Sequence, residues 1–369
     1  MLQSLLITIT GFISLLFSPG IGPAPLPGNT NSISPGDTLK YEKEKHLANI
    51  QQLTFGGDNA EAYWSFDSHK LTFQATRAAW NASCDQIFMF DVTKTLDANK
   101  TPQLISTGKG RTTCSYFMPG NKTILYASTH EADEACPKAP ERLVDGKYVW
   151  PIFPSFDIYV ANLKGKVKKK LTDSPGYDAE ATVSPKGDKI VFTSIRSGDL
   201  ELYTMDIDGK NVHQITNELG YDGGAFFSPD GTKLIFRTSR PKTPEEIELY
   251  KSLLAKNLVQ PVAMELFVCN VDGSDLRQLT HLGKANWAPF FTPKGDKIIF
   301  SSNHAAPKGY QFNLYMIGLD GKGLEQITYD PVFDSFPMFS PDGKKIAFSS
   351  NRNNGGTHDT NLFIADWVD

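Results

Sequence analysis

One short phrase returns along this chain and constrains its fold more than any other feature. In its clearest form the phrase reads Ser-Pro-Asp-Gly-Lys-Lys-Ile-Ala-Phe, at residues 340–348. Its essential parts are a tight turn and the apolar triplet that follows. Six copies can be recognised, with triplets at residues 71–73, 124–126, 190–192, 234–236, 298–300 and 346–348. A repeat of roughly 40 to 50 residues indicates a propeller or a solenoid, because one unit cannot bury its own faces and must stack on its neighbours.

Residues 179–216 show what one repeat contains. The composition predicts four strands, at 181–183, 190–193, 201–206 and 212–216, with tight turns at Pro185–Gly187 and Asp208–Gly209. Proline presets φ at the first corner of such a turn, and glycine accepts the positive φ that closes it. The repeat is therefore predicted to be one antiparallel four-stranded blade.

The two ends of the repeat region complement each other. The last copy stops at a third strand, 361–366, whereas residues 49–54 match a fourth strand that has no blade before it. We expect this N-terminal strand to complete the last blade and close the ring, which removes the open edges between the first and last units. The predicted fold is all-β, a six-bladed propeller of four-stranded antiparallel blades.

The order of turn, triplet, third strand with Asp-Gly and closing Leu-Thr resembles that of the exported TolB-like six-bladed propellers, over residues 49–366. No segment matches the additional N-terminal α/β domain of TolB itself. The resemblance thus implies the fold and an exported protein, but it does not imply particular partners.

The N-terminal region has the composition of an export signal. Residues 2–17 are apolar and too short for a comfortable membrane span, and small residues follow. We expect a signal peptide at 1–22, a flexible linker at 23–45 and the propeller at 46–369, with no membrane span after processing and a periplasmic or secreted, monomeric protein. A net charge of −4 and the lack of a long basic run argue against nucleic acid as a partner.

The four cysteines differ in their place within the repeat. Cys269 falls in a third strand and is expected to be buried, whereas Cys84, Cys114 and Cys136 fall at or near loops. In an oxidising compartment we expect Cys114 to form a disulfide with Cys136 or with Cys84, and we favour Cys136. No Cys-x-x-Cys motif indicates a zinc site.

Polar and charged residues recur on the face where the first strand of each blade begins and the second strand ends. The first group lies six residues before each turn and comprises Asn59, Thr112, Asp178, Asp222, Asn286 and Asp334. Glu61 and Glu180 lie four residues before their turns. The second group ends the second strands and comprises Arg77, His130, Arg196, Arg240, His304 and Arg352.

These two rings have two interpretations. In the first, each Asp braces an Arg of a neighbouring blade and satisfies buried loop amides. In the second, some charges stay unpaired over the channel mouth and bind a ligand. The candidate ligand-binding residues are Asp178, Glu180, Asp222, Asp334, Arg77, Arg196, Arg240 and Arg352. No cofactor or metal is expected, and a channel-bound ion such as calcium is left open.

Two insertions, residues 131–155 and 241–264, fall between second and third strands and should rise on this same face. The second is predicted to contain a helix, with Thr243 as its cap, Pro244 at its first position and Glu246 closing a capping box. Its apolar stripe of Ile247, Tyr250, Leu254 and Leu258 either packs on the blades or forms a lid.

Two functions remain open at this point. The first is a non-catalytic exported propeller that binds a protein or glycan of the cell envelope through the insertion-bearing face. The alternative is a hydrolase or lyase acting on a polysaccharide or glycoconjugate at the channel mouth, with Glu61 or Glu180 and His130 or His304 as catalytic groups.

Overall fold

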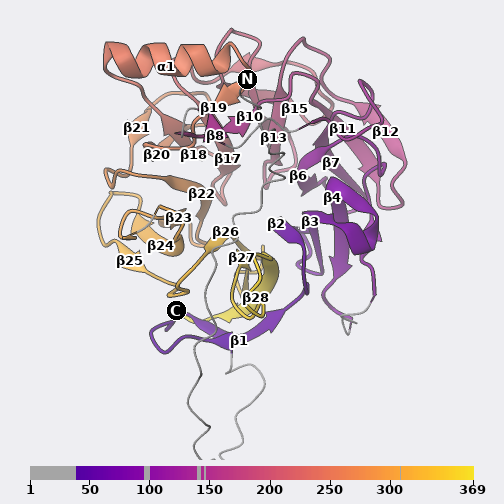
Figure 1. Cartoon of the computed structure of the whole chain (residues 1–369), viewed down its shortest axis with the longest axis vertical. Helices are drawn as coiled ribbons and strands as arrows, with labels where there is room; N and C mark the ends of the chain where they lie inside the picture. The colour runs from indigo at the N-terminus through magenta and orange to yellow at the C-terminus, as the bar shows by residue number, and fades with distance from the viewer. Residues whose placement is uncertain (1–38, 95–99, 139–142, 145–146, 308) are drawn as a thin grey trace, which may run out of the picture. The chain divides into compact units, whose positions relative to one another are not determined.

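The protein is described by a computed structural model that covers residues 39–94, 100–138, 143–144, 147–307 and 309–369. The expected signal peptide at 1–22 and most of the expected linker lie outside these residues. The described chain forms six four-stranded antiparallel sheets arranged around a central axis (Figure 1). The all-β six-bladed propeller is therefore confirmed.

Each blade runs from an inner strand to an outer strand in chain order. The first three blades comprise β2 (Asp58–Trp64), β3 (Lys70–Arg77), β4 (Ala82–Asp91) and β5 (Gln103–Leu104); β6 (Thr112–Phe117), β7 (Thr123–Ser128), β11 (Asp157–Asn162) and β12 (Val167–Lys170); and β13 (Asp178–Val183), β14 (Lys189–Ser194), β15 (Glu201–Asp206) and β16 (His213–Gln214). A 3₁₀ helix, Ala78–Trp80, lies between β3 and β4.

The other three blades repeat this order, with the sixth completed from the other end of the sequence. They comprise β17 (Asp222–Phe227), β18 (Lys233–Ser239), β20 (Met264–Asn270) and β21 (Arg277–Gln278); β22 (Asn286–Phe291), β23 (Lys297–Ser302), β24 (Asn313–Gly318) and β25 (Glu325–Gln326); and β26 (Asp334–Phe339), β27 (Lys345–Ser350), β28 (Asn361–Trp367) and β1 (Leu47–Gln52).

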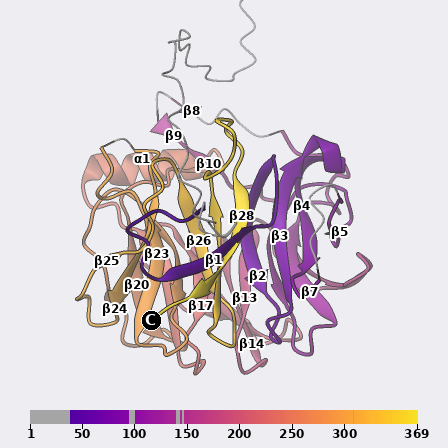
Figure 2. The ribbon, with the colours of Figure 1, turned by 90° about the horizontal axis from the view of Figure 1, so that it is seen from below.

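The ring is closed by β1, as the sequence predicts. This strand runs antiparallel to β28, with Leu47 opposite Trp367 and Gln52 opposite Phe363 (Figure 2). The fourth strand of the last blade is thus supplied by the N-terminal side of the propeller. Because β1 covers the edge of β28, the last blade presents no unpaired third strand.

The recurring turn has a side-chain reason as well as a backbone one. In the fourth blade, Ser228 Oγ donates to Asp230 and accepts from the backbone N–H of Lys233, at 2.9 Å. Ser340 and Asp342 repeat these bonds in the last blade. In the third blade, a Cβ at Gly187, where φ is +73°, would lie 2.8 Å from Pro119 of the preceding blade. The turn glycine therefore allows neighbouring blades to pack closely.

The closing Leu-Thr of each repeat also has a structural role. Thr216 Oγ1 accepts a hydrogen bond from the N–H of Leu202, at 2.9 Å, and so ties the end of the blade to its third strand. Equivalent bonds are made by Thr54, Ser106, Thr172, Thr280 and Thr328. The repeat conserves a hydroxyl at this point because it satisfies a buried backbone N–H.

Both insertions lie on one face of the ring (Figure 2). The first contains the short strands β8 (Leu143–Val144), β9 (Lys147–Tyr148) and β10 (Trp150–Pro151). The second contains α1 (Pro244–Leu254) and β19 (Leu258–Val259). The predicted capping box of α1 is confirmed, because Thr243 Oγ1 accepts from the N–H of Glu246 and the Glu246 carboxylate accepts from the N–H of Thr243.

The described end of the expected linker, residues 39–45, contacts the propeller. Glu44 is fully buried and accepts two hydrogen bonds from Arg352, and the hydroxyl of Tyr41 donates to Asp330 at 2.8 Å. Within the part of the chain that the structure describes, no helix is long and apolar enough to cross a membrane.

Candidate functional site

The two rings of charge predicted from the sequence form braces inside single blades. Arg196 donates two hydrogen bonds of 3.0 Å to the carboxylate of Asp178, where strands β13 and β14 lie side by side. Arg240 bonds Asp222 in the same way, and Arg352 bonds Asp334. The brace exists, but the expectation that it joins neighbouring blades is wrong. Each pair joins the first strand of a blade to a residue that follows the second strand of the same blade.

The fourth predicted arginine and the two histidines occupy the equivalent positions of the other three blades. Arg77 lies over the ring of Trp80, with its Cζ atom 4.5 Å from the ring centre. His130 lies against Tyr159 and pairs with Ser128 Oγ at 2.9 Å, and His304 lies against Tyr315 and pairs with Ser302 Oγ. The histidines thus replace the bracing arginines.

A second ring, one step further along each first strand, carries the candidate site. The residue four positions before each turn adopts the left-handed backbone conformation, with φ between 46° and 60°, and the strand pairing shifts there. These six residues are Glu61, Cys114, Glu180, Gly224, Ala288 and Phe336. Such bulges redirect side chains, and all six residues line one central cavity.

The cavity has a volume of about 410 Å³ and lies under the first insertion. Its walls include many aromatic rings, among them Tyr63, Tyr221, Phe226 and Trp287. The charged residues that line it are Glu61, Asp85, Arg111, Glu180 and Arg237. Of the predicted site residues, the structure brings Glu61 and Glu180 to this cavity. The bracing pairs, Arg77 and both histidines do not line it in the described chain.

Glu180 is the centre of a buried hydrogen-bond network. Its carboxylate accepts from an Nη atom of Arg237 at 2.9 Å, from the hydroxyls of Tyr177 and Tyr221, and from the backbone N–H of Gly224 at 2.5 Å. Burial raises the pKa of Tyr177 and that of Tyr221, so both hydroxyls remain protonated donors. The network spans two blades.

Glycine makes room for this network in the fourth blade. A Cβ at Gly224 would lie 1.9 Å from an Nη atom of Arg237, and a Cβ at Gly223 would lie 2.4 Å from a carboxylate oxygen of Glu180. The adjacent glycines in β17 are therefore a local requirement for the ion pair between Glu180 and Arg237.

Glu61 has a different environment. Its Oε2 atom accepts hydrogen bonds from the hydroxyl of Tyr63 and from the thiol of Cys114, each at 3.0 Å. Burial, followed by the repulsion from Glu180, raises the pKa of Glu61, although the two hydrogen bonds lower it. Burial and the charge of Glu61 likewise raise the pKa of the Cys114 thiol.

The two insertions meet above the cavity and form a cap, which we define as residues 148–153 together with 250–259. Within it β10 pairs with β19, so that Trp150 lies opposite Val259, and the N–H of Ile152 donates to the Asn257 carbonyl at 2.8 Å. Tyr250 and Leu253 of α1 are buried, and the Tyr250 hydroxyl donates to Asp199. The predicted stripe is confirmed for Tyr250, whereas Leu258 lies in β19 beyond the helix.

Trp150 packs the cap against the blades. Its indole contacts the guanidinium of Arg237, which lies 5.8 Å from the indole centre, and stacks on Trp287 at 5.0 Å. Trp287 in turn stacks on Phe312 at 4.4 Å. The cap therefore rests on a continuous aromatic row that begins at the ion pair of the cavity.

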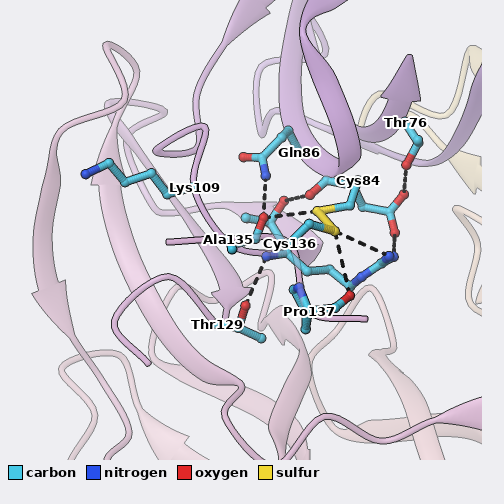
Figure 3. Close-up of a disulfide and its surroundings, with 12 residues drawn as sticks. Thr76, Cys84, Gln86, Lys109, Thr129, Ala135, Cys136 and Pro137 are labelled. Carbon is cyan, nitrogen blue, oxygen red and sulfur yellow. Dashed lines mark hydrogen bonds and ion pairs between the residues drawn. A yellow bond between two sulfur atoms is a disulfide. The ribbon is translucent and has the colours of Figure 1, made fainter. Parts of the chain in front are cut away.

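The disulfide lies beside the cavity and differs from the prediction. Cys84, in β4, is bonded to Cys136, in the first insertion (Figure 3). Cys114 is a buried free thiol, so both pairings considered from the sequence are wrong. Its bulge turns Cys114 toward Glu61. Cys269 is also free and buried, as predicted.

The comparisons with known proteins agree with this architecture. Residues 154–242 match the TolB beta propeller domain family. The putative TolB from Agrobacterium tumefaciens superimposes with a TM-score of 0.56 at 20% identity, over 85% of this chain and 91% of that one. The chain has the fold of the TolB-like β-propellers. No curated protein matches the sequence significantly.

Other solved structures share the TolB-like fold with this chain. TolB from Acinetobacter baumannii gives a TM-score of 0.50 at 18% identity, and this chain covers 64% of that protein while 85% of this chain is matched. A gluconolactonase from Xanthomonas campestris gives 0.54 at 13% identity, over 88% of this chain and 91% of that one. These identities establish the fold and leave the function to the site itself.

Sequence reasoning missed Arg237, Cys114 and the tyrosines of the cavity. A signal for two of them was present. Cys114 stands four residues before its turn, as Glu61 and Glu180 do, and Arg237 directly follows its apolar triplet, where other blades have Gln74, Ala127, Thr193, Ser301 or Ser349. A buried charge at that position is unfavourable unless it has a partner of opposite charge in the channel.

Proposed function

We propose that this TolB-like propeller is a non-catalytic, exported binding protein that receives a short segment of a partner protein in its central cavity. The observation that carries the proposal is the capped cavity of about 410 Å³, lined by aromatic rings and a few charged groups. Cavities of this size and composition are typical of ligand sites.

The polar groups of the cavity favour binding over catalysis. Glu180 is held by Arg237 and four further donors, and Arg111 pairs with Asp85, so these charges already have fixed partners. The buried Nε1 atom of Trp287, in contrast, has no hydrogen-bond partner among the described residues. A segment with backbone carbonyls supplies the acceptor that such a donor requires.

Export is part of the same proposal. The disulfide between Cys84 and Cys136 is compatible with an oxidising compartment, and the apolar residues 2–17 have the composition of a secretory signal. We therefore propose a periplasmic or secreted location, with the partner in the cell envelope.

Photocrosslinking in cells that express the full chain tests this function. Tyr148 lines the cavity and its side chain is exposed, so Tyr148→p-benzoylphenylalanine places the reactive group at the mouth. The control position is Lys186, in an exposed turn at the opposite end of its blade. We expect a protease-sensitive adduct from position 148 that Trp150→Ala weakens. Equal adducts from both positions, or none from either, contradict the proposal.

A second candidate, action on a glycan, is favoured by one observation. Glu61 and Glu180 line the same cavity in unlike environments, since only Glu180 has an arginine partner. Glycoside cleavage commonly uses two carboxyl groups in one site, one as acid and the other as base or nucleophile. Incubation with neutral and acidic oligosaccharides, followed by mass spectrometry, tests this. Cleavage that Glu61→Gln abolishes would replace our first proposal, and the binding function predicts intact oligosaccharides.

A further inference from the structure

The charges that line the cavity are unevenly matched. Three carboxyl groups line it, from Glu61, Asp85 and Glu180. Arg111 pairs with Asp85, and Arg237 pairs with Glu180 at 2.9 Å. Among the residues that the structure describes, Glu61 has no cation within ion-pair distance, and its hydrogen-bond partners are the neutral donors Tyr63 and Cys114.

The fold leaves Glu61 available to a ligand. Its left-handed backbone, with φ of 55°, belongs to the bulge that turns this position toward the channel, and its side chain lines the cavity. Arg237 is held by Glu180 and by the ring of Trp150, and Arg111 is held by Asp85 and by the ring of Phe153, 5.5 Å away. The charge of Arg237 lowers the pKa of Glu61, but the ion pair of Arg237 is with Glu180, and that of Arg111 is with Asp85.

The walls around this unmatched carboxyl suit a cation. Tyr63, Phe226 and Phe336 line the cavity together with Glu61, and the Tyr63 ring lies 6.1 Å from that of Phe226. Aromatic faces attract an ammonium or guanidinium group, and the attraction grows when the group is shielded from water. An anionic ligand would instead meet Glu61 and the nearby charge of Glu180.

We propose that the cavity is selective for a segment bearing a basic side chain, a lysine or an arginine, whose cationic head pairs with the carboxylate of Glu61 between the aromatic walls. This inference rests on the proposed function, and it names the chemistry that the bound segment must carry. The raised pKa of Glu61 fits a carboxyl group that lacks a cation until the ligand arrives.

Matched peptides test the inference. The probes are acetyl-Gly-Lys-Gly-amide and the same peptide with norleucine or glutamate in place of lysine, titrated into the full chain by calorimetry at pH 7.5. We expect the lysine peptide to bind at least about tenfold more tightly than the norleucine peptide, and the glutamate peptide to bind least. Glu61→Gln should remove the preference for lysine.

Controls separate a local charge effect from a general one. Glu134→Gln changes the net charge equally at an exposed salt bridge with Lys109, and it should leave the preference unchanged. If lysine and norleucine peptides bind equally well to the unmodified protein, the inference is overturned while cavity binding stands. If no peptide binds, the inference is also overturned, and the crosslink from position 148 then decides separately whether the binding function holds.

Discussion

Glu44 and Arg352 lie 308 residues apart in the sequence, yet an Nη atom of Arg352 donates a hydrogen bond of 2.9 Å to the Glu44 carboxylate. The second Nη atom bonds the same carboxylate at 3.2 Å, and the first also donates to the carboxylate of Asp334. All three residues are buried. The contact joins the segment that precedes β1 to the last blade, where the ring closes. The closure is therefore stabilised by a buried ion pair as well as by strand pairing.

Arg352→Met is expected to destabilise the protein by about 3 to 5 kcal/mol, because it leaves two buried carboxylates without their cation. Urea unfolding followed by tryptophan fluorescence measures the change. Arg196→Met is the matched control, since Arg196 braces Asp178 alone and is itself partly exposed. If Arg196→Met lowers the free energy of unfolding as much as Arg352→Met or more, the ion pair of Glu44 and Arg352 does not have this role.

Glu201 should make the stability depend on pH. Its side chain is buried, and burial and the charges of Asp222 and Asp199 raise its pKa from 4.5 to about 8. A carboxyl group whose pKa is raised by folding stabilises the folded state while protonated, and that contribution is lost as the pH rises from about 4.5 through 8.

Glu201→Gln should reduce the pH dependence of the stability. An amide already serves at the equivalent position in the first blade, where Ser106 Oγ donates to Gln86. We expect the variant to match the parent near pH 4 and to be more stable by on the order of 2 kcal/mol at pH 9. Parallel stability curves from pH 4 to 9 would show that Glu201 titrates normally.

Gly224→Ala should lower the free energy of unfolding by more than the strain of its left-handed backbone alone explains. The added methyl meets Arg237, whereas a Cβ at Gly283, where φ is +69°, would lie in open space. Gly283→Ala is therefore the control for backbone strain. We expect Gly224→Ala to be less stable than Gly283→Ala by about 2 kcal/mol, since overpacking adds to the strain. If thermal unfolding shows equal destabilisation of the two variants, a methyl group at position 224 does not disturb the ion pair of Glu180 and Arg237.

The disulfide assignment predicts the thiol count. The unfolded, unreduced protein should react with two equivalents of a thiol reagent, at Cys114 and Cys269. Peptide mapping should recover Cys84 joined to Cys136. Cys84→Ser with Cys136→Ser should lose about 2 to 4 kcal/mol of stability, whereas Cys114→Ser should leave the disulfide intact. A crosslinked peptide containing Cys114 would refute the pairing.

The repeat allowed the blades and their closure to be predicted, because strand composition and turn chemistry act locally. In the third blade the third strand, Glu201–Asp206, has the predicted bounds, while the fourth contains only His213–Gln214. The capping box of α1 was readable for the same reason, since its bonds span only a few residues.

The site was less predictable, because it depends on contacts between blades. Glu61 and Glu180 were recognised, but the left-handed bulge that turns them inward has no signature in their residue types. The pairing of β10 with β19, and with it the cap, joins insertions far apart in the sequence. The same long-range geometry decided which cysteine Cys136 could reach.

The most direct test of the account is a crystal structure of the full chain with bound acetyl-Gly-Lys-Gly-amide. We predict the peptide in the central cavity beneath the cap, with the lysine ammonium about 2.7 to 3.2 Å from the Glu61 carboxylate. A peptide bound on the opposite face of the ring, or a lysine directed away from Glu61, would contradict the account.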